Sequence, residues 1–486
     1  MVDREHHDTT SGYGRGMLQL ALANAAYVLT AYVVTTITAR VLEPADFGTF
    51  GVVMAWITIL TALLVKGLAT STAREMAAGR VEPVTAWRAG RSLGIRLAIG
   101  LAVIGIAASP LAAVLFNSTG HAEQFAIGAL GAFTFGVNAV LLAWPTGIRD
   151  YSRQALAQVA YALARVALVV GGAIAYGLDG AVVGYVLAPL LSAASIVMRR
   201  PADATAIADV RRRMWRHVVP VSLVSVAVTA YFVVDVFALS SVVGEGSPQL
   251  GVYVAYGTVA HVPFFLLQAA SVAMVPALAA ARGAAARAGA IRRTMTDTIV
   301  LLAGPTLLLA TAGDAAARVV FGRDYQVAEL VALPLALATG AVTVLANLVA
   351  VDVAVGRLRE SLAVAGGGAA LVAASAWLVA DRATSGQAAA VAWAACVSSL
   401  LAMVVLALVV RARHHALLER ARTVRGVALA SAFAVVPLVA SDDIVRTVLA
   451  ALAGVAWLGL VLRLRLVDLR RGTPVPAALE DPQPPA

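Results

Sequence analysis

The feature that most restricts the fold of this chain is a series of apolar blocks of about 20 residues, a length at which a helix crosses about 30 Å of hydrocarbon. Hydrophobic residues make up 60% of the 486 residues and charged residues 13%, against about 25% charged in an ordinary globular domain. A water-soluble fold could not bury that much apolar surface. Because the blocks lack the two-residue alternation of barrel strands, the sequence predicts an all-α, polytopic membrane protein.

We expect about fourteen transmembrane helices, of which the thirteenth is short. The predicted spans are 17–39, 48–71, 92–116, 125–147, 155–176, 181–198, 218–242, 250–279, 295–319, 327–351, 361–380, 387–410, 427–441 and 444–463.

The distribution of arginine predicts the orientation of these helices. With the N-terminus in the cytoplasm, 30 of the 37 basic residues fall in cytoplasmic segments and five in external ones. Cytoplasmic loops carry such an excess, so we expect both termini in the cytoplasm of a multi-pass protein of the inner (cytoplasmic) membrane. The net charge of +10 therefore reflects topology and does not indicate a nucleic-acid partner.

Corresponding features recur along the two halves of the chain. Gly48 and Gly251 each open a predicted helix beside an aromatic residue, 203 residues apart. Phe116 and Phe321 each close one, 205 residues apart, and Arg149 and Arg357 lie 208 apart. Six helices per repeat is an even number, so both halves enter the membrane in the same direction. The sequence thus predicts two parallel six-helix bundles around a central cleft, plus two extra C-terminal helices.

This reading divides the chain into seven parts. We expect a cytoplasmic N-terminal segment, a first bundle, a basic cytoplasmic linker, a second bundle, a second cytoplasmic linker, helices 13 and 14, and a proline-rich disordered tail. Their residues are 1–16, 17–200, 201–216, 217–410, 411–426, 427–466 and 467–486.

Five short motifs in order along the chain resemble a known family, the polysaccharide-repeat-unit flippases of the multidrug/oligosaccharidyl-lipid/polysaccharide exporter superfamily. They are the segment 38–48 (TARVLEPADFG), Ala73-Arg74-Glu75, Asp235, the segment 250–255 (LGVYVA) and Phe321-Gly322-Arg323-Asp324-Tyr325. The resemblance implies a flippase that moves a polyprenyl-pyrophosphate-linked oligosaccharide from the cytoplasmic to the outer leaflet for cell-surface polysaccharide assembly. It also implies the lipid-linked glycan and the bilayer as partners, with a polysaccharide polymerase and glycosyltransferases as further candidates.

Three other functions stay open at this point. An ion-coupled small-molecule exporter of the same superfamily is expected to carry carboxylates in its cleft. A membrane polysaccharide polymerase or ligase is expected to need a large external catalytic loop, and the external connections here are short. An inactive flippase-like scaffold is the third.

The first candidate for a substrate site is Arg165. It lies twelve residues beyond Arg153, roughly 18 Å into the fifth helix and close to the membrane midplane. Gln158 and Tyr161 lie on the same helical face. A charge at that depth costs about 2.5–3.5 kcal/mol on insertion scales, so it is expected to face a cavity or a partner. We predict that Arg165 holds the pyrophosphate; the alternative is an arginine bonded to a neighbouring helix.

The other cleft candidates are Lys66, Asn24 and Tyr27. Lys66 is the one lysine of the chain and could bind phosphate at the inner mouth of the cleft or reach the lipid headgroups. Asn24 and Tyr27 belong to a polar stripe on the first helix, which is explained by cleft lining or by helix packing.

Two further residues are candidates for ion coupling. Asp235 lies in the outer part of the predicted seventh helix, where it is a cation site or an interfacial carboxylate. His261 lies near mid-membrane, where it either titrates during transport or hydrogen-bonds in its neutral form between helices.

Signatures of bound cofactors are missing from the sequence. It has no phosphate-binding Gly-Lys-Ser/Thr loop, and no Cys or His ligand cluster, with Cys396 its single cysteine. We therefore expect no metal, no cofactor and no enzymatic activity, and energy from an ion gradient, the membrane potential or consumption of product.

Overall fold

The structure is a computed structural model, and it describes residues 2–77, 81–148, 150–194, 207–244, 246–265, 267, 284–326, 330–355, 358–383, 385–414 and 417–467. Helices and short connecting segments make up these residues, with no strand among them. The expected all-α fold is thus confirmed.

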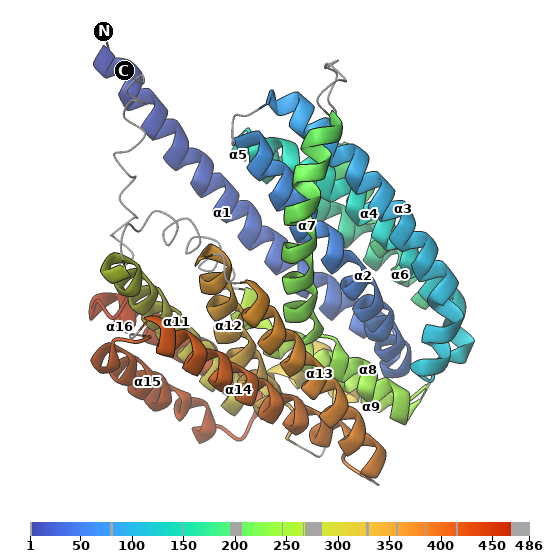
Figure 1. Cartoon of the computed structure of the whole chain (residues 1–486). Coiled ribbons are helices and arrows are strands. Elements are labelled where there is room, and N and C mark those ends of the chain that lie inside the picture. Colours follow the sequence, from blue (N-terminus) through green and yellow to red (C-terminus); the bar gives the residue numbers. More distant parts are fainter. Residues whose placement is uncertain are drawn as a thin grey trace. The chain divides into compact units, whose positions relative to one another are not determined.

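The helices follow one another along the chain as predicted, with differences at their ends (Figure 1). The first part comprises α1 (Val2–Val41), α2 (Pro44–Ala77), α3 (Pro83–Leu115), η1 (Thr119–His121), α4 (Ala122–Gly147), α5 (Tyr151–Arg165), η2 (Val166–Val170) and α6 (Gly171–Ala194). Next come α7 (Ile207–Ala230), α8 (Val234–Val243), α9 (Pro248–Ala260), α11 (Ala284–Phe321), η3 (Arg323–Tyr325), α12 (Ala332–Val355), α13 (Leu358–Arg382) and α14 (Gln387–His414). The last elements are α15 (Arg420–Ala434), η4 (Val436–Val439) and α16 (Asp443–Arg463).

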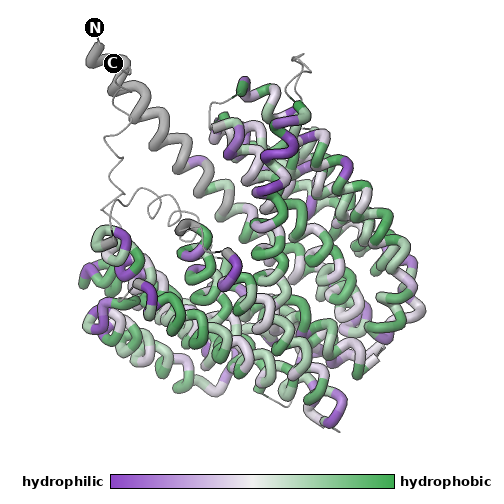
Figure 2. The backbone as a smooth tube through the Cα atoms, in the orientation of Figure 1, coloured by the Kyte–Doolittle hydropathy of each residue, from purple (hydrophilic) through white to green (hydrophobic). Residues whose placement is uncertain are grey.

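Within the described residues, ten helices are long and apolar enough to cross a membrane, or eleven if the bent pair α7 and α8 forms one span. Their outward side chains are strongly apolar: Ile104 on α3 is 63% exposed and Val455 on α16 is 72% exposed. Figure 2 shows hydrophobic residues along the helices and hydrophilic ones mostly near helix ends. Such surfaces suit a hydrocarbon solvent, so the chain is a multi-span membrane protein.

Several predicted boundaries differ from the structure. The predicted span 218–242 is broken: α7 starts at Ile207, inside the predicted linker 201–216, and a 48° bend separates α7 from α8. The predicted linker 411–426 is largely helical, because α14 runs to His414 and α15 starts at Arg420. The predicted thirteenth helix, 427–441, starts earlier than expected and gives way to the 3-10 turn η4. Residues 468–486 of the predicted tail and 201–206 of the linker lie outside the described residues.

A tight reversal joins the predicted fifth and sixth spans. The backbone leaves helical geometry at Tyr176 and at Gly177, whose φ is +59°, a value that favours glycine. A Cβ on Gly172 would lie 2.1 Å from the Gly180 carbonyl oxygen, and one on Gly184 would lie 2.1 Å from that of Leu168. These two pairings are centred on Tyr176, so the helical segments on either side of it run antiparallel in close backbone contact.

The π-helical segment η2 lies between Arg165 and this reversal. A π turn holds one residue more than an α turn and often occurs at functional positions.

By contacts the chain divides into two compact units. The first unit contains residues 1–258, 320–328 and 372–391. In it α2 packs against α3, α4 and α7, while α1 packs against α5. Part of its core is a cluster of Leu68, Trp87, Val140 and Met214, and the Trp87 indole donates to the Val140 carbonyl (3.1 Å).

The second unit contains residues 259–319, 329–371 and 392–486, and it includes the extra helices α15 and α16. The Trp457 ring of α16 packs directly on Gly304 of α11, where a Cβ would lie 2.5 Å from it. The Arg318 guanidinium of α11 donates to both Asp443 carboxylate oxygens at 2.6 and 2.7 Å. Helix α16 therefore packs against α11, the predicted ninth helix, and is joined to it by an ion pair.

Candidate functional site

Arg165, at the end of α5, is buried with 6% of its surface exposed. One guanidinium nitrogen, Nη2, donates to the Tyr27 carbonyl oxygen at 3.0 Å. The guanidinium carbon lies 5.0 Å from the Tyr27 ring centre and 5.4 Å from that of Tyr161, within cation–π range. Backbone and aromatic groups thus hold the cation.

No carboxylate among the described residues forms an ion pair with Arg165, and its Nε is buried without a hydrogen-bond partner there. Buried charges are ordinarily paired, and buried donors ordinarily bonded. The guanidinium consequently retains both charge and hydrogen-bonding capacity for an anion.

Gln158 and Tyr161 lie on the same helix as Arg165, at the spacing that the sequence indicated. Tyr161 packs against Arg165 and the Tyr27 ring, with ring centres 5.7 Å apart. The Oε1 atoms of Gln154 and Gln158 are buried without a hydrogen-bond partner in the described part of the chain. One face of α5 therefore carries a cation and two acceptor oxygens.

On α1 the structure places Tyr27 beside Arg165. The carbonyl of Tyr27 binds the guanidinium, a backbone contact that no side-chain pattern could have indicated. Thr35 of the same predicted stripe donates to the Ala31 carbonyl of its own helix (2.9 Å), as a packing residue does. The side chain of Asn24 lies outside the described residues, as does that of Lys66 on α2.

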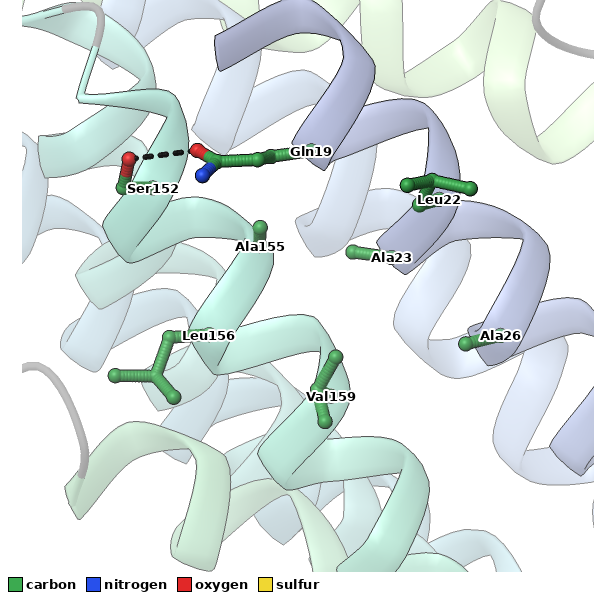
Figure 3. Close-up of a pocket in the computed structure, with 8 residues that line it drawn as sticks. All are labelled: Gln19, Leu22, Ala23, Ala26, Ser152, Ala155, Leu156 and Val159. Carbon is green, nitrogen blue, oxygen red and sulfur yellow. Dashed lines mark hydrogen bonds between the residues drawn. The ribbon is translucent and has the colours of Figure 1, made fainter. Parts of the chain in front are cut away.

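An apolar groove runs between α1 and α5 (Figure 3). Its volume is about 420 Å³, and its lining residues are Gln19, Leu22, Ala23, Ala26, Ser152, Ala155, Leu156 and Val159. The Ser152 hydroxyl donates to Gln19 Oε1 (2.8 Å) at one end. At the other end Ala26 precedes Tyr27, the residue whose carbonyl binds Arg165. The groove is thus a largely apolar surface on the two helices, α1 and α5, that carry Tyr27 and Arg165.

Asp235 lies at the start of α8 and is 5% exposed. It accepts hydrogen bonds from the Tyr253 hydroxyl of α9 (2.7 Å) and from the Val236 amide (2.9 Å). The structure thus pairs Asp235 with a tyrosine and joins α8 to α9. Whether it also binds a cation stays a prediction.

His261 follows α9 and belongs to the second unit, and its carbonyl accepts from the Phe265 amide (3.3 Å). Residue 266 and residues 268–279 of the predicted eighth helix lie outside the described residues. The coupling role of His261 stays a prediction as well.

Sequence reasoning missed one buried carboxylate of the second unit. Asp352 of α12 is fully buried and accepts from the Ser361 hydroxyl of α13 (2.5 Å) and from Arg413 of α14 (3.3 Å). Asp352 lies one residue beyond the end of the predicted tenth span, 327–351. Among the described residues no group of three or more His, Cys, Asp or Glu side chains could hold a metal ion.

Solved structures share the fold over most of the chain. The lipid II flippase MurJ in an inward closed conformation matches with a TM-score of 0.71 at 10% identity, covering 92% of this chain and 99% of that one. An inward-facing multidrug resistance MATE family transporter of the MOP superfamily matches with a TM-score of 0.66 at 17% identity, covering 83% and 98%. At these identities the likeness establishes the fold. The curated proteins include no match.

A family model described as "Polysaccharide biosynthesis protein" matches residues 13–281, more than half of the chain. The resemblance that the motifs suggested is thereby confirmed. The protein has a transporter fold of the MurJ and MATE type, and it belongs to the polysaccharide biosynthesis protein family.

Proposed function

We propose that this protein is a flippase for a polyprenyl-pyrophosphate-linked oligosaccharide, which it moves from the cytoplasmic to the outer leaflet for cell-surface polysaccharide assembly. The observation that carries the proposal is Arg165, a buried cation without an acidic partner among the described residues. An unpaired buried charge is unfavourable until an anion arrives. A pyrophosphate supplies that anion.

The shape of the guanidinium suits this ligand. Nη2 is committed to the Tyr27 carbonyl, while Nε has no partner among the described residues. Charge-assisted hydrogen bonds from arginine to phosphate oxygens are short and strong, and the planar fork can bind two oxygens together. The Oε1 atoms of Gln154 and Gln158 can accept hydrogen bonds from sugar hydroxyls.

The groove between α1 and α5 accommodates the other part of such a substrate. Its apolar lining suits an isoprenoid chain, and it lies on α1 and α5, the helices that carry Tyr27 and Arg165. A carrier lipid joins an apolar chain to a pyrophosphate, and the groove and Arg165 lie on the same pair of helices.

In this proposal the protein works by alternating access in the inner membrane, with both termini in the cytoplasm. Arg165 holds the pyrophosphate, with Lys66 at the inner mouth and Asn24 and Tyr27 lining the path. Asp235 and His261 couple transport to an ion, and a polymerase and glycosyltransferases are the partners. The family description, the MurJ-type fold and the basic site support this reading.

A small-molecule exporter is the second candidate, since MATE transporters share the fold. An exporter of cations is favoured by free carboxylates, but the buried Asp352 is paired with Arg413. An unpaired arginine favours an anionic substrate instead. A polymerase or ligase is expected to need a large external catalytic loop, and the predicted external connections are short. An inactive scaffold would leave Arg165 without a role.

The test compares cells that carry Arg165→Ala, Arg153→Ala or no protein. Arg153 is the matched control because it lies on the same helix, and its side chain is 58% exposed and pairs with Asp150. Deletion and Arg165→Ala should make completed repeat units accumulate on the carrier in the cytoplasmic leaflet. Export by Arg165→Ala should fall on the order of tenfold, since hydrogen bonds to charged groups contribute about 1.5–3 kcal/mol.

Three other outcomes would contradict the proposed function. Normal export by Arg165→Ala at wild-type abundance removes the proposed site. Shortened chains at the cell surface after deletion indicate a polymerase, and unchanged glycans indicate a scaffold or an exporter of another substrate.

A further inference from the structure

Exposed arginines gather in the second unit, where α15 begins and α16 ends. Because α15 and α16 are consecutive apolar helices long enough to cross the membrane, the start of one and the end of the other lie at the same membrane face. We name these exposed residues, with one from α11, the basic cluster. Its members are Arg293, Arg420, Arg425, Arg463 and Arg465.

A partly buried arginine, Arg422, holds the elements of this region together. Its guanidinium donates to the Asp297 carboxylate of α11 (2.6 Å), to Glu419 (2.9 Å) and to the Leu466 carbonyl (3.1 Å). The Glu419 amide also donates to the Thr296 hydroxyl of α11 (2.8 Å). Every member of the basic cluster lies within four residues of one of these contacts. The cluster is therefore gathered around a fixed joint between α11, α15 and α16.

The acidic side chains that the structure describes at this end of the unit are already paired. Two partly buried arginines, Arg413 and Arg422, take them up. Their partners are Asp352, Glu360, Asp297 and Glu419. No member of the basic cluster forms an ion pair with any described residue. The charge of the basic cluster is thus uncompensated within the described part of the chain.

Exposed apolar side chains alternate with these arginines. Leu462 is 40% exposed and Leu464 is 55% exposed, on either side of Arg463. On α15, Val424 is 66% exposed beside Arg425. A free phosphate or an acidic protein segment requires the charges alone, whereas a phospholipid presents a phosphate together with acyl chains. The mixture of basic and apolar surface therefore fits an anionic phospholipid.

The backbone at Arg465 provides a separate observation. Its φ is +52°, a left-handed conformation that favours glycine at the end of a helix. The Arg465 amide donates to the Leu462 carbonyl (3.2 Å), and the Leu466 amide donates to the Val461 carbonyl (3.0 Å), so the residue ends α16 as glycine ordinarily does. Strain of this kind often accompanies functional positions. An arginine at this position indicates a use for its charge.

We propose that the basic cluster binds the headgroup phosphate of an anionic phospholipid in the leaflet at this face of the membrane. Guanidinium groups form short, charge-assisted hydrogen bonds with phosphate oxygens. The exposed leucines and valine contact the acyl chains. The bound lipid neutralises the cluster and stabilises the joint between α11, α15 and α16. The inference goes beyond the proposed function, because the site lies in the second unit and its ligand is not transported.

The experiment measures lipid binding to the purified full chain in detergent micelles by native mass spectrometry. The ligands are phosphatidylglycerol, which is anionic, and phosphatidylcholine, which is zwitterionic. Each arginine near an anionic lipid contributes about fivefold to affinity. Arg463→Gln and Arg465→Gly should each weaken phosphatidylglycerol binding about fivefold, and the double variant about 25-fold. Binding of phosphatidylcholine should not change in these variants.

Two features of the design separate lipid binding from folding. Arg465→Gly removes the side chain where the backbone favours glycine, so its thermal stability without phosphatidylglycerol should be no lower than that of the parent. The matched control is Arg382→Gln, since Arg382 is the exposed last residue of α13, as Arg463 is of α16. The control should bind phosphatidylglycerol as the parent does.

Unchanged phosphatidylglycerol binding in the double variant overturns the proposal, and so does equal weakening by Arg382→Gln. Displacement of the lipid by millimolar inorganic phosphate would assign the basic cluster to a free anion and overturn the lipid assignment. Loss of phosphatidylglycerol binding in Arg165→Ala, with normal binding in the double variant, would place the lipid at the proposed substrate site instead. Because the cluster variants keep Arg165, failure here is distinct from failure of the proposed function.

Discussion

Replacement of Arg165 by methionine should abolish function without a large loss of stability, and this combination separates a binding arginine from a structural one. Methionine has similar length and no charge. If Arg165 were a structural residue, its replacement would lower stability and function together.

The magnitude follows from the contacts of the guanidinium. Its burial costs about 2.5–3.5 kcal/mol on insertion scales. Against this stand one hydrogen bond from a charged donor, about 1.5–3 kcal/mol, and two cation–π contacts of about 0.5–2 kcal/mol each. These contributions nearly offset one another, so Arg165→Met should change the free energy of unfolding by less than about 2 kcal/mol.

The loss of binding should be much larger than that of stability. The methionine variant forfeits every charge-assisted hydrogen bond to pyrophosphate, which predicts a rise in Kd of at least about tenfold. Arg165→Lys keeps the charge and loses the planar fork, so its Kd should lie between those of wild type and Arg165→Met.

The assay uses the purified full chain in nanodiscs. Thermal unfolding without ligand reports stability, and titration with polyprenyl pyrophosphate reports affinity, with Arg153→Met as control. Wild-type affinity in Arg165→Met refutes the assignment of the site. A collapse of stability in the ligand-free variant, matching its loss of binding, refutes the reasoning that Arg165 is not needed for folding.

Two further substitutions test other parts of the structure. Ala155→Phe fills the groove between α1 and α5, so in nanodisc titrations it should weaken binding of long-chain polyprenyl pyrophosphate about tenfold and leave binding of inorganic pyrophosphate unchanged. Leu163→Phe, at an exposed position, should change the binding of neither ligand. Equal weakening of both ligands by Ala155→Phe would contradict a binding site for the lipid chain. In Gly304→Ala the added methyl group overlaps the Trp457 ring and should lower the free energy of unfolding by about 1–3 kcal/mol. In the control Gly459→Ala the added methyl group meets no atom within 4 Å, so the free energy of unfolding should not change. Equal stability of the two variants would contradict close packing of α16 on Gly304.

The sequence predicted those features that depend on local spacing. The length of the apolar blocks predicted the membrane helices, because the thickness of the hydrocarbon region sets how many residues a helix needs to cross it. The face shared by Gln158, Tyr161 and Arg165 followed from helical periodicity alone, and the structure places Tyr161 and Arg165 in contact. The reversal near Tyr176 fell between two predicted spans.

Features set by tertiary contacts could not be predicted. The turn at 231–233 between α7 and α8 contains no glycine or proline, so its sequence carries no sign of a break. Tertiary hydrogen bonds hold the segment after this turn: the Asp235 carboxylate accepts from the Tyr253 hydroxyl, and the Ser240 hydroxyl donates to the Phe116 carbonyl. The Tyr27 carbonyl that binds Arg165 is likewise invisible, since every residue has one.

The π-helical segment Val166–Val170 carries one surplus residue at a decisive place. Each residue of an α-helix advances the winding by about 100°. The surplus thereby sets the angle between Arg165, which turns towards Tyr27, and Gly172, which must turn towards Gly180. A single-residue deletion here would leave both residues in the chain and yet point one of them away from its partner. An alignment that ignores this offset would pair the wrong residues on one side of it.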